Sequence, residues 1–142
     1  MPEPASSLIA FIQRWQASSG NERGNYQLFL SEWCDLLGVA RPNPKGAIAG
    51  DPYCFDRDVT IYHPSGKKSA GFIDLYKEHC FILEAKQGGV SGGKVGTAKR
   101  GTETYRKAMR GAFNQAVSYA RTFKNCPPFL ITCNIGEGRQ IF

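Results

Sequence analysis

The sequence predicts an α/β domain with a central mixed β-sheet flanked by α-helices. Three observations indicate this fold class. Helical spacing of apolar residues occupies the first 37 residues, β-forming runs occupy residues 53–86, and a long helical pattern then precedes another apolar run at 129–134. With 142 residues, 42% of them hydrophobic, the chain is long enough to bury one core. We therefore expect a single domain over residues 1–142.

Two helices are expected at the start of the chain. Residues 5–18 place apolar side chains at helical spacing, with Ser6 or Ser7 as a possible cap. A second helix is expected from Glu22 to about Leu37, where Gly38 would end it. The apolar stripe of this helix is expected to be buried and consists of Tyr26, Phe29, Leu30, Trp33, Leu36 and Leu37.

Strands and turns are expected next. Residues 41–52 contain three prolines and two glycines, which predicts a loop. A strand follows at 53–62, and a hairpin of strands 70–76 and 80–86 comes after a turn at 63–66. The glycine-rich, basic residues 87–101 predict a mobile loop without the spacing of a nucleotide-phosphate loop.

The last part of the chain predicts a helix and two strands. The helix covers about 102–123, and Pro127 and Pro128 follow it. Its expected buried side consists of Met109, Ala112, Phe113, Ala116, Val117, Ala120 and Phe123. A short buried strand is expected at 129–134, and 139–142 begin another. The abrupt end within that strand suggests a piece of a longer polypeptide.

Composition narrows the class of protein. No apolar run approaches the roughly 20 residues that cross a bilayer, and the first residues do not resemble a signal peptide, so a cytoplasmic protein is expected. The number of cysteines is odd, they are widely spaced and no C-x-x-C pair occurs, so neither a disulfide framework nor a zinc site is indicated. We expect reduced, mostly buried thiols. Net charge is +6, and residues 86–110 hold seven Lys or Arg against one acid, which favours a polyanionic partner.

The expected hairpin carries the candidate chemistry, with Asp74, Glu84 and Lys86 in a D-x9-E-x-K pattern. One register of the hairpin puts Asp74 beside Glu84, and strand alternation puts Lys86 on the same face as Glu84. The carbonyl of Ala85 could add a neutral ligand. Such hard oxygen ligands select Mg²⁺ or Mn²⁺, which would stabilise charge on a scissile phosphate. Lys86 would orient or deprotonate the attacking water, or neutralise the transition state.

This spacing alone is a short motif that any exposed hairpin face could carry. Its setting within strongly β-forming runs of a basic chain favours a phosphodiesterase site. Four segments strengthen this interpretation by their likeness to a known family: NERGNYQLFLSEWCDLLGV, GFIDLYKEHCFILEAKQ, VGTAKRGTETYRKAMRGAFNQAVSYAR and PPFLITCNIGEGRQIF. With these segments the chain resembles the PD-(D/E)XK nuclease superfamily, and more closely the N-terminal nuclease domain of MmeI-like restriction–methyltransferase proteins.

The resemblance implies a restriction-endonuclease-like fold and Mg²⁺-dependent DNA cleavage by Asp74, Glu84 and Lys86. Ile73 stands where the motif has proline, an apolar replacement that leaves the expected activity unchanged. The resemblance also suggests that Glu22 completes the acidic cluster. The alternative for Glu22 is a carboxylate that complements the helix dipole.

Further residues are expected to assist DNA binding or cleavage at this site. Gln115 and Tyr119 match a Gln-Ala-x-x-Tyr helix of the family and share one helix face, where they could position a water or a phosphate. The alternative is a polar edge on a core helix. Lys94, Lys99 and Arg100 are expected to contact DNA phosphates, the alternative being a solvated flexible loop.

The preferred hypothesis is a Mg²⁺-dependent DNA endonuclease domain of a prokaryotic restriction or phage-defence protein. The resemblance implies methyltransferase and target-recognition domains in the same polypeptide, and this sequence has neither an S-adenosylmethionine loop nor an N-P-P-Y motif. Cutting both strands would need two active sites, hence a transient homodimer. The alternatives are a catalytically silent nuclease fold that binds DNA or assists assembly, and a nuclease for RNA or branched DNA.

Overall fold

The fold is known from a computed structural model that describes residues 4–17, 22–46, 49–86, 90–91, 94–95 and 103–135. The chain clusters into two compact units. Unit 1 contains Met1–Arg41, Ala85–Met109 and Cys133–Phe142, and unit 2 contains Pro42–Glu84 and Arg110–Thr132. No helix among the described residues is both long enough and apolar enough to cross a membrane.

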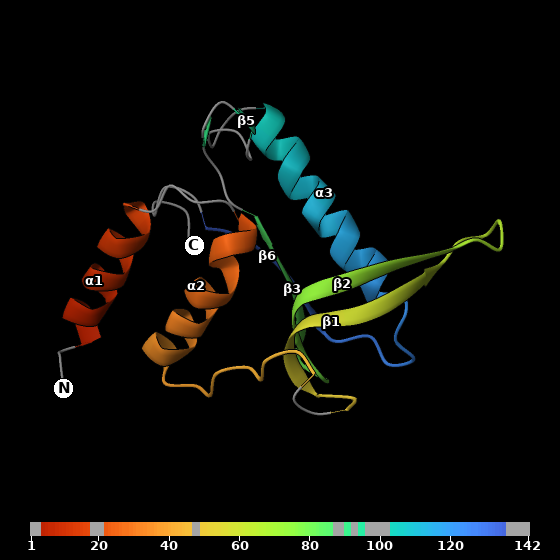
Figure 1. Cartoon of the computed structure of the whole chain (residues 1–142), viewed down its shortest axis with the longest axis horizontal. Helices are drawn as coiled ribbons and strands as arrows, with labels where there is room; N and C mark the ends of the chain where they lie inside the picture. The colour runs from red at the N-terminus through yellow and green to blue at the C-terminus, as the bar shows by residue number, and fades with distance from the viewer. Residues whose placement is uncertain are drawn as a thin grey trace. The chain divides into compact units, whose positions relative to one another are not determined.

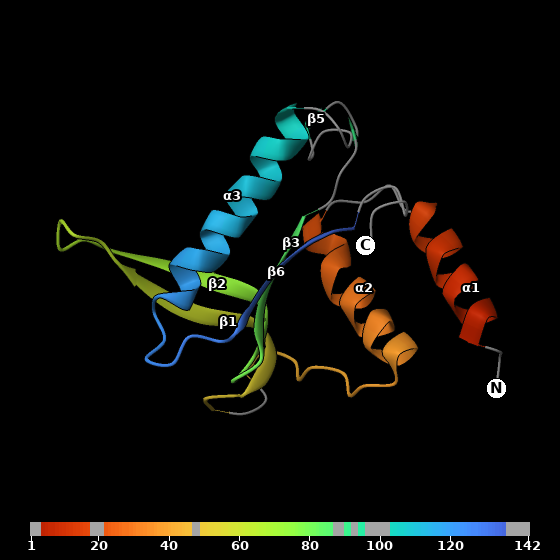
Figure 2. The same cartoon turned by 180° about the vertical axis from the view of Figure 1, so that it is seen from behind.

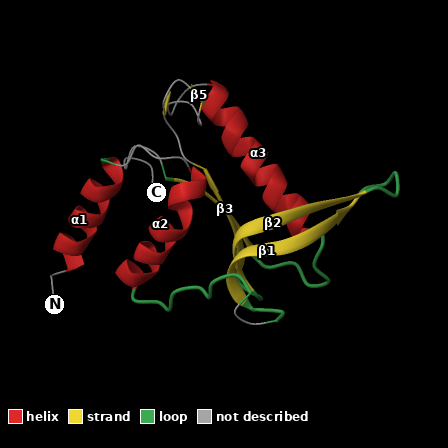
Figure 3. Ribbon diagram, in the orientation of Figure 1, coloured by secondary structure: helices red, strands yellow, loops and turns green. Residues whose placement is uncertain are grey.

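Within these described ranges, the main sheet has four strands in the order β1-β2-β3-β6, which are labelled in Figure 1. Figure 3 draws the strands in yellow and labels β1, β2 and β3. They are β1 (Tyr53–Tyr62), β2 (Lys68–Lys77), β3 (Phe81–Lys86) and β6 (Phe129–Asn134). The pairs β1–β2 and β2–β3 are antiparallel. Along β6, the N–H of Phe129 donates to Cys80 and that of Ile135 donates to Lys86, so β6 advances in the same direction as β3. The predicted α/β class with a mixed sheet is confirmed.

Helix α3 (Glu103–Ala120) covers one face of the sheet in unit 2. The core between them consists of Val59, Ile73, Tyr76, Ile82, Ala116, Tyr119 and Ala120. The helix ends at Ala120 rather than at Phe123, because the N–H groups of Thr122 and Phe123 each bond a carbonyl three residues back. Phe113 was expected to be buried and is 49% exposed, which makes that prediction wrong.

The error at Phe113 has a geometric cause. The buried side of α3 is formed by Ala112, Ala116, Tyr119 and Ala120, which are spaced i, i+4, i+7 and i+8. Phe113 follows Ala112 and therefore points about 100° away from this stripe. The small alanines let the helix backbone approach the sheet closely, and the large aromatic side chain of Phe113 stays outside the contact.

In unit 1, helices α1 (Pro4–Gln16) and α2 (Glu22–Leu37) pack through aromatic rings. The ring of Phe29 lies 5.3 Å from that of Phe11 and 5.2 Å from that of Trp15, measured between centroids. Gly38 follows α2 with a φ of 69°, the left-handed conformation typical of a residue that ends a helix. Leu37, expected to be buried, is 64% exposed, because the buried stripe of α2 runs through Tyr26, Phe29, Leu30 and Cys34 instead.

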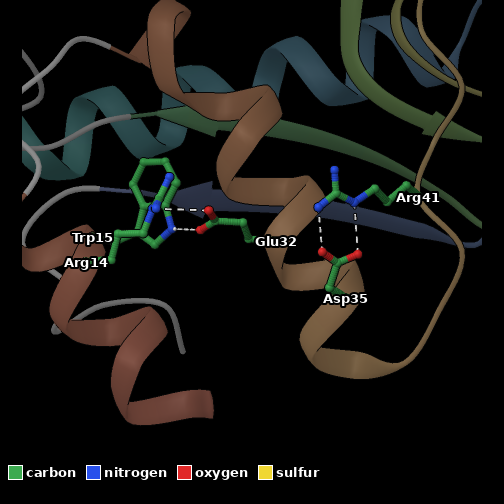
Figure 4. Close-up of polar contacts among 5 residues, drawn as sticks. All are labelled: Arg14, Trp15, Glu32, Asp35 and Arg41. Atoms are coloured by element: carbon green, nitrogen blue, oxygen red, sulfur yellow. Dashed lines mark hydrogen bonds and ion pairs between the residues drawn. The ribbon is translucent and has the colours of Figure 1, made fainter. Parts of the chain in front are cut away.

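Polar contacts reinforce this helix pair (Figure 4). The indole Nε1 of Trp15 donates to Oε2 of Glu32 at 2.7 Å, and Nε of Arg14 lies 3.1 Å from Oε1 of the same carboxylate. Glu32 therefore binds two side chains of α1 at once. Just beyond α2, Nε of Arg41 donates to Asp35 at 2.9 Å. This hydrogen bond lowers the pKa of the Asp35 carboxyl from its ordinary value.

The two short strands β4 (Val90–Ser91) and β5 (Lys94–Val95) form a small antiparallel pair within residues 87–101, for which a loop was predicted. The expected strand at 139–142 lies outside the described residues.

Candidate active site

Asp74 and Glu84 lie on neighbouring antiparallel strands. The register of β2 and β3 pairs Leu75 with Leu83 and Tyr76 with Ile82, and Asp74 and Glu84 are the next residues along their strands. The backbone N–H of Asp74 donates to Oε1 of Glu84 over 3.4 Å, a long hydrogen bond. The structure therefore brings these two acidic residues close to each other.

Both carboxylates lie in the interior. Asp74 is 9% exposed and Glu84 is 2% exposed, while Ile73 and Ile82 beside them are fully buried. Burial removes hydration from a carboxylate, which disfavours its charged form. A bound cation would offset this effect. The donor set, made of hard anionic oxygens, fits Mg²⁺ or Mn²⁺ better than a soft metal.

Strand β3 continues directly from Glu84 to Ala85 and Lys86. Strand alternation points the half-buried Lys86 to the same side as Glu84. The carbonyl of Lys86 accepts a hydrogen bond from the N–H of Ile135 at 2.7 Å, which holds the end of this strand. Among the described residues, no three His, Cys, Asp or Glu side chains gather into a metal site. A cation at Asp74 and Glu84 would therefore need neutral oxygens as well.

Helix α3 brings Gln115 and Tyr119 into the same region of unit 2. Nε2 of Gln115 donates to the phenol oxygen of Tyr119 at 2.6 Å, and Tyr119 is 4% exposed. Burial raises the pKa of the Tyr119 phenol. Hydrogen bonds from Gln115 and from the Phe72 backbone lower it, while the charges of Glu84 and Asp74 raise it. The phenol is therefore close enough to both carboxylates to be influenced by their charge.

Gly71 is a residue that the sequence analysis missed. A β-carbon at this position would lie 2.9 Å from both Cε1 and the phenol oxygen of Tyr119, closer than real side chains pack. Only glycine lets the ring lie against this part of β2. A glycine inside a strand often marks such a close approach, so its position in the predicted hairpin was the available signal.

The structure does not describe the side chains of the remaining expected site residues. Glu22 begins α2 and Lys94 begins β5, but the side chains of both lie outside the described part of the chain. Lys99 and Arg100 lie entirely outside the described residues. The roles suggested for these four residues stay predictions.

The fold and these residues define an α/β protein with a buried pair of carboxylates beside a helix-borne glutamine and tyrosine. The sequence model of one family, described as "MmeI, N-terminal domain", matches residues 5–140. The chain belongs to this family, which gives it a restriction–modification context. No match was found among curated proteins or among solved structures.

Proposed function

We propose that the chain is a Mg²⁺-dependent DNA endonuclease domain of the PD-(D/E)XK type. The observation that carries the proposal is the juxtaposition of buried Asp74 and Glu84 on neighbouring strands, with Glu84 Oε1 3.4 Å from the Asp74 nitrogen. Membership of the MmeI N-terminal family supports a role in restriction or phage defence.

The carboxylates of Asp74 and Glu84 and the backbone carbonyl of Ala85 would hold Mg²⁺, for which Mn²⁺ would substitute. When bound, the ion supplies Lewis-acid stabilisation of the negative charge that develops on the scissile phosphate. Glu22 is proposed to complete the acidic set. The low exposure of Asp74 and Glu84 strengthens electrostatic interactions at this position, because water screens them less.

The chain's own residues orient and activate the reactants. The Lys86 ammonium attracts the phosphate and orients the attacking water, which loses its proton to the solvent. A bond forms between the water oxygen and phosphorus while the bond from phosphorus to the leaving deoxyribose oxygen breaks, and that oxygen takes up a proton from the solvent. Gln115 holds Tyr119 through the 2.6 Å hydrogen bond, and this pair positions the water or the phosphate beside the carboxylates.

The proposed domain works within a larger assembly. One active site cuts one strand, so cleavage of both strands uses a second copy in a transient homodimer. Methyltransferase and target-recognition domains in the same polypeptide place the nuclease on its DNA. Lys94, Lys99 and Arg100 add phosphate contacts that carry no sequence information.

The test is nicking of supercoiled plasmid DNA with Mg²⁺ or Mn²⁺ at high protein concentration. We compare the wild type with Asp74→Asn, which keeps the size of the side chain and removes its charge. Loss of a direct metal ligand is expected to lower nicking more than about 100-fold, since even outer-shell partners change metal affinity or activity by about 10- to 100-fold.

The matched control is Asp58→Asn, which makes the same change on β1 of the same unit. The Asp58 side chain is 76% exposed and pairs with Lys45 at 2.7 Å. This control is expected to nick as fast as the wild type. Equal nicking by the wild type and Asp74→Asn would exclude the assignment.

Metal binding provides a second readout that does not depend on cleavage. An ion that binds only the folded state raises the melting temperature by mass action. Mn²⁺ should raise the melting temperature of the wild type and of Asp58→Asn, and should leave those of Asp74→Asn and Glu84→Gln unchanged. DNA binding without nicking and without any Mn²⁺ effect would replace the nuclease proposal with a silent DNA-binding module.

A further inference from the structure

We propose that the far end of the β1–β2 hairpin, residues 59–71, is a DNA-contacting arm that lies in a groove of duplex DNA. We call this segment the hairpin arm. The inference rests on the proposed function for the identity of the partner, duplex DNA. It adds a binding surface that none of the expected site residues belongs to.

The hairpin arm extends past the third strand of the sheet. In the described part of the chain, β3 pairs with β2 at Leu75–Lys77, whereas β1 and β2 remain paired as far as Tyr62 and Lys68. Figures 1 and 2 show the two strands projecting beyond the C-terminal part of α3 in both views. Every residue from 62 to 70 is exposed. Proteins usually shorten or cover strand edges that have unpaired backbone groups. A long exposed hairpin therefore points to a function for this surface.

The turn of the hairpin arm has a defined shape. The N–H of His63 donates to the Lys67 carbonyl at 2.9 Å, and the N–H of Gly66 donates to the His63 carbonyl at 2.9 Å. His63 Nε2 lies within 2.7 Å of the Ser69 hydroxyl, across the two strands. Gly66 adopts a φ of 83°, which favours glycine. A preformed ribbon loses less conformational entropy on binding than a disordered loop does.

One face of the hairpin arm is available to a partner. On the inner face, Val59 belongs to the core cluster and Gly71 lies against Tyr119. The outer face carries Thr60 and Ala70, which pair with each other, and Tyr62 and Lys68, which also pair. All four are exposed, and Tyr62 is 70% exposed.

The chemistry of this face is complementary to nucleic acid. Residues 59–73 include Lys67 and Lys68 and contain no Asp or Glu. Nζ of Lys68 lies 5.4 Å from the ring centroid of Tyr62, so a cation and an exposed aromatic ring are presented together. Lysines contact phosphates, and the major groove, about 12 Å wide, admits a two-stranded ribbon. An acid-free, basic ribbon therefore fits duplex DNA.

The test measures DNA binding by fluorescence anisotropy, using the full chain in EDTA and a labelled duplex of about 30 base pairs, roughly three helical turns. The variant Lys67→Glu/Lys68→Glu reverses both charges of the hairpin arm. The matched control is Arg121→Glu/Lys124→Glu, which makes the same charge change at two exposed residues of the same unit. Thermal melts check that both variants are folded.

The hairpin-arm variant is expected to bind the duplex at least about 10-fold more weakly. The slope of log affinity against log salt concentration should become shallower by the amount that about two phosphate contacts contribute. The control is expected to lose less than about threefold, because the phosphate contacts of the arm remain. Equal weakening of the two variants would overturn the proposal by showing a general charge effect. It would also be overturned if the wild type did not bind the duplex, or if it preferred single-stranded DNA of the same length.

The result is independent of cleavage, because EDTA removes the metal. If Asp74→Asn binds the duplex as the wild type does and the arm variant does not, the hairpin-arm proposal is supported whether or not the plasmid is nicked. If nicking depends on Asp74 while both double variants bind the duplex equally, the nuclease proposal is supported and the hairpin-arm proposal is rejected.

Discussion

Tyr119 lies against the backbone of Gly71 so closely that a β-carbon at residue 71 would be 2.9 Å from the phenol oxygen. The contact joins α3 to β2 three residues before Asp74. It leaves the phenol in hydrogen-bonding distance of Gln115 and within the electrostatic influence of Asp74 and Glu84. The position of the ring beside the carboxylates thus depends on a residue that has no side chain.

Gly71→Ala should therefore displace Tyr119. The added methyl overpacks a buried contact, which we expect to lower the free energy of unfolding by about 1–3 kcal/mol, as measured by urea denaturation. If the proposed nuclease is correct, nicking should fall about 10- to 100-fold, because misplacement by about 1 Å is costly in an active site.

Gly111→Ala is the control for this change. A β-carbon there would meet nothing within 4 Å, and alanine favours the helix, so stability should rise by about 0.4–1 kcal/mol. Identical behaviour of the two alanine variants would show that the Tyr119 contact does not constrain residue 71.

Arg57 is expected to stabilise unit 2 by a cation–π contact. Its guanidinium carbon lies 4.5 Å from the centroid of the Tyr76 ring, which stacks on Phe123 at 4.9 Å, and Nη1 donates to the Asp51 carbonyl at 2.7 Å. Arg57→Ala should cost about 2 kcal/mol of unfolding free energy, measured in urea.

Arg57→Lys keeps the charge but loses the planar group, so it should recover less than half of that stability. The exposed Arg121 gives the comparison, because Arg121→Ala should change stability by less than about 0.5 kcal/mol. Full recovery by lysine would show that charge alone accounts for the effect of Arg57.

Two buried tyrosines predict a loss of stability at alkaline pH. Burial raises the pKa of both Tyr76 and Tyr119, so the folded state holds these protons more tightly than the unfolded state does. The resulting stability is complete below the unfolded pKa of about 10 and is lost as pH rises through the higher folded values.

The free energy of unfolding in urea should therefore fall as pH rises above about 10, and Tyr119→Phe should reduce that fall. Tyr62→Phe removes a phenol that is 70% exposed and should leave the fall unchanged. An equal reduction in the two variants would contradict the role given to burial.

The cysteines should differ in their reactivity. Burial raises the pKa of the Cys133 thiol to about 12, whereas Cys126 is exposed, and only a thiolate reacts readily with iodoacetamide. At about pH 8 mass spectrometry should find Cys126 labelled first and Cys133 protected. In urea all five cysteines should react. Labelling of Cys133 at the rate of Cys126 in native protein would show that this end of β6 opens readily.

Much of the fold could be predicted from local sequence signals. The bounds of α2, β1 and β6 coincide with the expected ones, because Gly38, the turn at 63–66 and the prolines before residue 129 end or begin these elements. Strand β2 begins at Lys68 rather than at residue 70, because pairing with β1 draws two polar residues into the ladder. Hydrophobic alternation does not detect such residues.

Only the part of the candidate site that lies on the β2–β3 hairpin could be predicted from the sequence. The short turn between β2 and β3 limits the possible registers, and one of them pairs Asp74 with Glu84. The approach of Tyr119 to Gly71 depends on α3, which folds back onto the sheet from far along the chain. No local pattern reports how closely two such segments pack.

Strand β2 carries both Lys68 of the hairpin arm and Asp74 of the carboxylate pair. A strand advances about 3.3 Å per residue, so six residues separate the two positions by about 20 Å. Because duplex DNA rises about 3.4 Å per base pair, this spacing corresponds to roughly six base pairs. An extended strand cannot stretch, so the distance from the arm's contact to the cut phosphate would be constant, and a substrate ending nearer than that to the cut would lose the arm's contribution to binding.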